Sequence, residues 1–283
     1  MSVSNKVLSS ALGLITATTL VGYSHDATAA LLFDRGLPSQ NLNGAAGANR
    51  SNIRWATDAQ NQGFFGDDFT IGSVGETYTI DTLRVWVVPG LSIGDPNSLN
   101  DFFNSVSLLV GGSAGSNLTS LASTTNFVSD PNISFTKVTY PDGTNATTYD
   151  NFGTPVNLWQ VDFSNLNWTI DGGVEYSFGV KGIGKQIGAS TIFYPWFNHG
   201  SNAALSGSTQ DGADDRFLEF DASGNFVATI NSDGNGFDKS TDINIQVFGE
   251  LQSAKTPEPG TWLATILAVG MTCAIKKKSF WRC

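Results

Sequence analysis

The sequence predicts an all-β protein, a two-sheet antiparallel β-sandwich with a jelly-roll-like arrangement. Apolar and polar residues alternate along short segments: Ile243, Ile245 and Val247 fall on one side of a strand, and polar or aromatic residues fall between them. The chain has 31 glycines, many of them between such segments. No segment between residues 31 and 255 has a sustained apolar period of 3.6 residues. Half-apolar strands of this kind are typical of antiparallel sheets with one buried face.

The expected strands are short and end at Gly, Asn or Asp turns. The first long expected strand covers residues 76–88. Its apolar side chains at or near alternating positions are Tyr78, Ile80, Leu83, Val85 and Val87. In a later one, the side chains expected to point inward are Val174, Tyr176, Phe178 and Val180. About ten to twelve strands without an internal repeat favour a sandwich over a propeller or solenoid, and the strand order stays open.

Residues 1–29 have the pattern of a secretory signal peptide. A single cation, Lys6, precedes a mostly apolar stretch over 7–21, and the small residues Ala27-Thr28-Ala29 suit cleavage before Ala30. An uncleaved membrane anchor is the alternative. Cleavage would leave the extracellular sandwich domain as residues 30–252.

The C-terminal end predicts a short transmembrane helix. A linker over 253–260 leads into the uncharged segment 261–275, and a basic cytoplasmic tail follows over 276–283. A helix of this length reaches about 22 Å, against a hydrocarbon core of about 30 Å, so it spans if the flanking lysines reach toward the headgroups. The cations of the tail are Lys276, Lys277, Lys278 and Arg282. Their position keeps the tail in the cytoplasm and the domain outside.

The linker contains Pro257, Glu258 and Pro259 directly before this apolar and basic tail, in a chain with a signal peptide. This combination resembles the PEP-CTERM sorting signal of exported bacterial proteins. The resemblance covers about thirty C-terminal residues, and it implies recognition and removal of the tail by an exosortase, a membrane-embedded cysteine protease. It also implies transient anchoring in the inner membrane, release to the cell surface or the extracellular space, and a host that makes exopolysaccharide.

Charge and cysteine content exclude several kinds of partner and site. Residues 30–257 hold 23 of the 25 Asp and Glu but only 10 of the 15 Lys and Arg, which argues against nucleic-acid binding. An acidic surface is compatible with cations and with neutral glycans. The two cysteines, Cys273 and Cys283, both lie in the tail, so the exported part has no disulfide and no thiolate metal site.

We expect no enzymatic activity. The expected domain has one histidine, His199, which we interpret as a surface-loop residue, and no Gly-x-Ser-x-Gly nucleophile motif occurs. A secreted glycoside hydrolase or lyase is the alternative, and it requires two carboxylates facing each other in a cleft. The glutamates of the domain, each expected on the polar face of a strand, are Glu76, Glu175, Glu219 and Glu250.

Two acidic loops are possible Ca²⁺ sites, since Ca²⁺ takes six to eight oxygen ligands. Their ligand residues would be Asp211, Asp214 and Asp215 in the first loop, and Asp233, Asn235, Asp238 and Asp242 in the second. Ordinary turns rich in Asp and Asn are the alternative. A third acidic pair, Asp67 and Asp68, is interpreted as the end of a strand.

Aromatic residues give a possible glycan-binding platform. Tyr194, Trp196 and Phe197 surround Pro195, and proline belongs at a sheet edge rather than at its centre. Burial in the core is the alternative, and it is the better interpretation for Trp86 and Trp159.

These observations predict a non-enzymatic exported protein of the cell surface or the extracellular matrix, associated with exopolysaccharide. The alternatives are a carbohydrate-binding module, a secreted glycoside hydrolase or lyase, and a single-pass surface protein that keeps its anchor.

Overall fold

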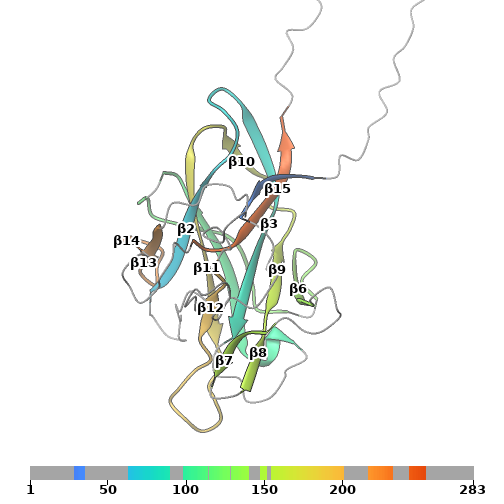
Figure 1. Cartoon of the computed structure of the whole chain (residues 1–283), viewed down its shortest axis with the longest axis vertical. Coiled ribbons are helices and arrows are strands. Elements are labelled where there is room, and N and C mark those ends of the chain that lie inside the picture. The colour runs from blue at the N-terminus through green and yellow to red at the C-terminus, as the bar shows by residue number, and fades with distance from the viewer. Residues whose placement is uncertain are drawn as a thin grey trace, which may run out of the picture.

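The computed structural model describes residues 29–35, 63–89, 98–113, 115–127, 129–139, 147–151, 154–200, 216–231 and 242–252. In these residues the protein is all-β, and two antiparallel sheets pack face to face as a sandwich (Figure 1). The predicted fold class is confirmed at this level. Strand β3 is the longest strand described, with 13 residues, and it forms the centre of the first sheet.

The first sheet has the order β1-β15-β3-β9-β6, and two short strands, β10 and β12, also pair with β3. The bounds of these strands are β1 Ala30–Asp34, β15 Ile245–Leu251, β3 Thr77–Pro89, β9 Trp159–Phe163, β6 Ile133–Lys137, β10 Trp168–Asp171 and β12 Trp196–Asn198.

The second sheet has the order β14-β13-β2-β11-β4-β5. Its strands are β14 Phe226–Asn231, β13 Arg216–Phe220, β2 Phe64–Thr70, β11 Glu175–Gly184, β4 Phe103–Gly111 and β5 Thr119–Thr124. A separate hairpin joins β7 Thr147–Asn151 to β8 Thr154–Asn157, and a single 3₁₀ turn, η2 Leu99–Asp101, precedes β4.

The main core lies between the two sheets. It contains the apolar side chains that the alternation of apolar and polar residues predicts. The apolar residues predicted on β3 are all buried: Tyr78, Ile80, Leu83, Val85 and Val87. They belong to one cluster with side chains of β4 and β11. Trp86 and Trp159 are also buried, with 1% and 3% of their surface exposed, as the core interpretation predicts. Of the side chains predicted to point inward near β11, Phe178 and Val180 are buried but Val174 is 38% exposed.

Polar side chains on the outer face of β15 and just before it are more buried than the alternation of apolar and polar residues suggests. Asn244 is 0% exposed and Gln246 4% exposed. Gln246 belongs to a polar network on the outer face of the first sheet, where its amide donates to Asp34 over 3.0 Å. In the same network, Arg84 donates to both carboxylate oxygens of Asp162 over 2.7 and 2.8 Å. Alternation therefore identified the inner face correctly but did not show that polar residues would be covered on the outer one.

The start of β1 and the end of β15 lie at the same end of the first sheet. The two strands are antiparallel neighbours, with Ala30 opposite Gly249. Figure 1 shows β1 crossing beside β15 at the end of the domain where β15 finishes. In the part of the chain that is described, no helix has the length and apolar character needed to cross a membrane. The predicted spanning segment 261–275 lies outside the described residues.

A glycine allows the two sheets to come close around Trp196. A Cβ atom added to Gly182 of β11 would lie 2.3 Å from the Trp196 ring, far inside a normal contact. The indole also packs edge-on against Phe103 of β4, with the ring centroids 5.1 Å apart. Trp196 belongs to the first sheet, so these contacts join the sheets through one large side chain.

We therefore expect Gly182→Ala to destabilise the domain by about 1–3 kcal/mol, because the added methyl group forces the indole out of place. Gly112→Ala is a matched control, since nothing lies within 4 Å of its added Cβ, and we expect a change within about 0.5 kcal/mol. Denaturant unfolding of the two variants measures both values. Equal losses of stability in the two variants would show that the close contact between Gly182 and the Trp196 ring does not require a glycine.

Candidate functional site

Most of the residues to which the sequence assigns a function lie outside the described residues. These are the sorting motif Pro257, Glu258 and Pro259, the basic tail Lys276, Lys277, Lys278 and Arg282, and the possible calcium ligands Asp211, Asp214, Asp215, Asp233, Asn235 and Asp238. Their roles stay predictions. Asp242, at the end of the second acidic loop, is described and is fully buried.

The aromatic residues considered as a glycan platform are packed into the fold. Trp196 is 0% exposed, and its ring N–H donates to Asn198 over 3.0 Å. Tyr194 is half-buried and packs edge-on against Phe102, with the ring centroids 4.9 Å apart. Phe197 is half-buried beside a small apolar cluster on the outer face of the first sheet. Trp196 therefore belongs to the core, as the alternative interpretation holds, and it offers no face on which a sugar ring could stack.

His199 is not a surface-loop residue, and that prediction is wrong. Its exposed fraction is 0%. The reason is its position directly after β12, where the backbone N–H of His199 donates to Trp86 and its carbonyl accepts from Asn244, each over 2.9 Å. These two bonds fix the chain between β3 and β15, so the histidine is held where those strands and β12 meet.

A buried ion pair connects the two sheets. Arg35, the residue after β1, donates from Nη1 to Asp67 of β2 over 2.6 Å, and both side chains are 0% exposed. The same nitrogen donates to the carbonyl of Ile243 over 3.2 Å, and Nη2 donates to the carbonyl of Asp68 over 2.8 Å. The guanidinium group therefore bonds a side chain and a carbonyl of β2 in one sheet, and the segment that leads into β15 in the other.

Asp67 is surrounded by donors as well as by other charges. Its Oδ2 also accepts from the backbone N–H of Ile243 over 2.6 Å, and its Oδ1 accepts from the N–H of Asp68 over 2.8 Å. Burial raises the pKa of Asp67 well above its ordinary value, the charge of Arg35 lowers it, and the charges of Asp242 and Asp68 raise it further. The fold thus brings Asp242 from the second acidic loop close to the acidic pair of β2.

Asp67 and Asp68 do not end a strand, contrary to the sequence interpretation. They occupy the middle of β2, between Phe64 and Phe69, which are both 1% exposed. Carboxylates inside such a phenylalanine-rich strand need a buried cation, and the sequence signal for one was present in Arg35 at the end of an apolar segment. The local pattern does not predict this pair, because 32 residues separate Arg35 from Asp67.

The described part of the chain places no three His, Cys, Asp or Glu side chains so that they could hold a metal ion. At the buried ion pair, the cationic role is filled by the guanidinium group. We interpret this ion pair as a structural element. Both side chains are fully buried, and they bond to each other and to the backbone.

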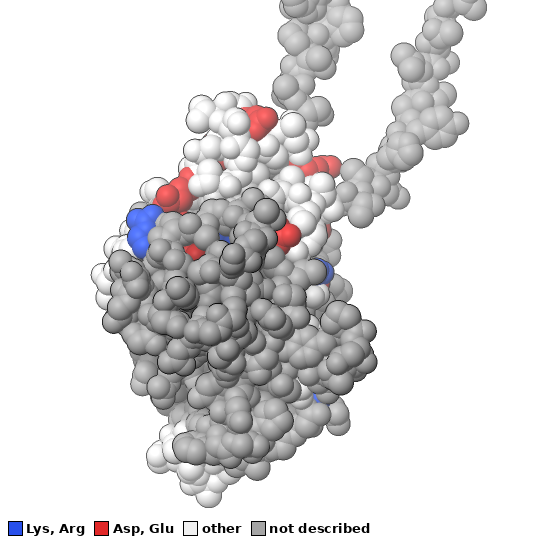
Figure 2. Space-filling view, in the orientation of Figure 1, with Lys and Arg blue, Asp and Glu red and all other residues white. Residues whose placement is uncertain are grey.

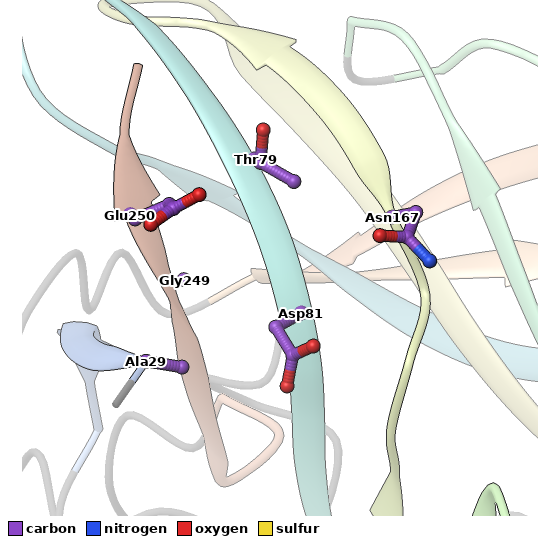
Figure 3. Close-up of a pocket in the computed structure, with 6 residues that line it drawn as sticks. All are labelled: Ala29, Thr79, Asp81, Asn167, Gly249 and Glu250. Carbon is purple, nitrogen blue, oxygen red and sulfur yellow. The ribbon is translucent and has the colours of Figure 1, made fainter. Parts of the chain in front are cut away.

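A small surface pocket of about 200 Å³ lies on the outer face of the first sheet (Figure 3). It is lined by Ala29, Thr79, Asp81, Asn167, Gly249 and Glu250. Thr79 and Asp81 are two residues apart on β3 and so share a face, and Glu250 of β15 is directly opposite Thr79. Asn167 completes the lining from the loop before β10, where it adopts a left-handed backbone conformation with φ of 48° that asparagine tolerates.

Glu250 is exposed on β15, which confirms its predicted position on the polar face of a strand. The sequence pattern does not predict that Asp81, Glu250 and Ala29 line one pocket. These residues come from three segments that only strand pairing brings together.

Comparisons with protein-family models, with curated proteins and with solved structures gave no match to this chain.

We expect Arg35→Met to cost about 3–5 kcal/mol of unfolding free energy, because it leaves the Asp67 charge buried without its cation. The double variant Arg35→Met with Asp67→Asn should be more stable than Arg35→Met, since the amide oxygen can still accept from Ile243 without a buried charge. Arg84→Met is the control at a partly exposed ion pair and should cost about 1 kcal/mol or less. A double variant no more stable than Arg35→Met would contradict the assignment.

The pH dependence of stability supplies a separate prediction. A carboxyl group with a raised pKa in the folded state keeps its proton where the unfolded chain has lost it. Its contribution to stability is therefore complete below the unfolded pKa of about 4 and is lost as the pH rises through the folded pKa. We therefore expect the unfolding free energy of the wild type to fall, relative to that of Asp67→Asn, as the pH rises from 4. A difference that stays constant with pH would contradict the raised pKa.

Proposed function

We propose that this chain is an exported, non-enzymatic β-sandwich protein that a PEP-CTERM-type tail directs to the cell surface or the extracellular matrix, where it associates with exopolysaccharide. The proposal names an exosortase-type protease as the processing partner and the inner membrane as a transient location. The observation that carries it is Pro257-Glu258-Pro259 directly before an apolar segment and a basic tail, in a chain that begins with a predicted signal peptide. The position of the two junctions, at Ala30 and at residue 252, is compatible with it.

Both junctions lie at one end of the domain. Ala30 begins β1 opposite Gly249, two residues before β15 ends at Leu251. A signal peptide joined before Ala30 and a tail joined after residue 252 would therefore both meet the sandwich at this end. This arrangement suits a domain whose two flanking segments enter the same membrane. Both segments can reach the membrane from the same end, and neither has to run the length of the folded domain.

The core is also suited to export as a unit without disulfides. The buried cluster draws on strands of both sheets, and the chain has no cysteine before Cys273. A domain of this length buries enough apolar surface to be stable without cross-links.

We further propose that the sandwich is jelly-roll-like. Strand β2 is the neighbour of β11 in the second sheet, while β3 is the neighbour of β10 in the first. The successive strands β2 and β3 thus run beside the successive strands β11 and β10, with one member of each pair in each sheet. This is the arrangement that results when a long antiparallel ribbon is rolled into a sandwich.

An exposed aromatic platform is not part of the proposal, because Trp196 is in the core. Among the described residues, the large apolar side chains that are exposed are aliphatic: Leu31, Val74, Val174, Ile192, Val227 and Leu251. Association with polysaccharide would then rely on polar contacts, for which the acidic and Asn-rich composition of the exported part is suited.

The test is replacement of Pro257, Glu258 and Pro259 by alanine in the native host, followed by intact-mass measurement of the protein from the cell envelope and from the medium. We expect the wild type to lack the residues after about position 257, and the variant to keep them and stay in the membrane. Alanine at Ser253 and Lys255, in the same linker, is the control and should leave processing unchanged. Identical mass and location of wild type and triple variant would refute the sorting role.

A further inference from the structure

The pocket on the outer face of the first sheet lies at the point where the predicted signal peptide ends. Ala29 lines the pocket, and the nitrogen of Ala30 is bonded directly to the carbonyl carbon of Ala29. Figure 3 shows Ala29 at the start of β1, beside Gly249 of β15 and on the side of the pocket nearest Asp81. The register explains this position, because Ala30 is the partner of Gly249 and Glu250 is the next residue.

Among the described residues that line the pocket, the charged side chains are both carboxylates. Asp81 and Glu250 supply two carboxylates, and the remaining polar side chains, Thr79 and Asn167, are neutral. Asp81 is half-buried and accepts from the neighbouring Thr82 hydroxyl over 2.7 Å, while Glu250 is exposed. On the described part of the face in Figure 2, several separate Asp and Glu residues lie at the surface.

Hydrolysis of the bond between Ala29 and Ala30 would create a cation at this position. Water is added across the peptide bond, so that a carboxylate leaves with the signal peptide and the nitrogen of Ala30 becomes a primary amine. An α-amino group of ordinary pKa takes up a proton near neutral pH. The product is an ammonium group attached to the first residue of β1, with three N–H donors where the uncleaved chain has a single amide N–H.

We propose that this pocket is the binding site of the protein's own α-ammonium group, formed at Ala30 when the signal peptide is removed, and that Asp81 and Glu250 hold it by charge and hydrogen bonds. The inference rests on the proposed export and cleavage. It gives the acidic pocket an occupant from the chain itself, and it makes removal of the signal peptide a step that strengthens the attachment of β1 to β15.

The geometry favours the α-ammonium group over a metal ion. The pocket offers two carboxylates from neighbouring strands, and among the described residues no group of three His, Cys, Asp or Glu side chains could hold a metal ion. An ammonium group needs only two or three acceptors, and these come from Asp81, Glu250 and the neutral oxygens of Thr79 and Asn167.

The experiment measures the pKa of the α-amino group of Ala30. The chain 30–283 is made with a removable leader in place of residues 1–29, so that Ala30 becomes the first residue without any export step. Competitive acylation across a pH series, read out by peptide mass spectrometry, gives the pKa in the folded protein and in denaturant. We expect a higher pKa in the folded protein, because nearby carboxylates favour the charged form, and a smaller difference in about 1 M salt.

Glu250→Gln and Asp81→Asn should each lower the pKa of the α-amino group toward its value in denaturant. Asp101→Asn removes an exposed carboxylate of η2, outside this pocket, and is the matched control that should leave the pKa unchanged. Glu250 is exposed, so its variant keeps the fold even if the Asp81 variant does not. Equal pKa values in folded and denatured protein, or no effect of Glu250→Gln, would overturn the proposal.

N-terminal sequencing of the protein exported by its host separates this result from the proposed function. A first residue of Ala30 together with a raised pKa supports both. A first residue of Ala30 with an unshifted pKa overturns the binding of the α-ammonium group and leaves the export proposal standing. Any other first residue overturns the cleavage site on which the binding depends.

Discussion

The ion pair between Arg35 and Asp67 is the constraint on which the arrangement of the sandwich depends. Both charges are fully buried, and transfer of each ion from water costs several kcal/mol even after the protein relaxes. The guanidinium group also bonds two carbonyls, and the carboxylate also accepts two backbone N–H groups, and these bonds offset part of this cost. The remainder is the reason that the pKa of Asp67 stays raised. Because these partners belong to different sheets, the pair is satisfied only when the sheets are assembled in one relative position.

This constraint explains why the first strand of the domain is held at a defined place. Strand β1 has five residues and lies at the edge of the first sheet, where a short strand would be prone to fraying. The N–H of Arg35 donates to Ile245 over 3.0 Å, and its side chain reaches Asp67, so the end of β1 is attached to both sheets. The start of β1 then lies beside Gly249, which is the geometry used by the proposed export and by the proposed binding of the new N-terminus.

The sequence predicted the features that depend on local alternation, and it missed those that depend on partners far along the chain. The inner face of β3 follows from an approximate period of two, and so does that of β15 and the residues just before it, with Ile243, Ile245 and Val247 buried. Asp67 was misread because its cation lies 32 residues earlier, and a charge inside an apolar strand looks like a strand end when the partner is unknown. The surface-loop prediction for His199 is wrong for the same reason, and the burial of Trp196 also depends on distant partners, since these contacts come from strands β3 and β11 and from the segment before β15.

Hydrogen exchange of the folded protein tests most directly whether Arg35 attaches β1 to the whole sandwich. The backbone amides to follow are that of Arg35, bonded to Ile245, and that of Ile243, bonded to Asp67. We expect both amides to exchange only through global unfolding, with the same free energy as the central strand β3. Exchange of the Arg35 amide through a local opening of much lower free energy would show that β1 is held independently of the core. The buried ion pair would then not be the constraint that fixes the domain's end.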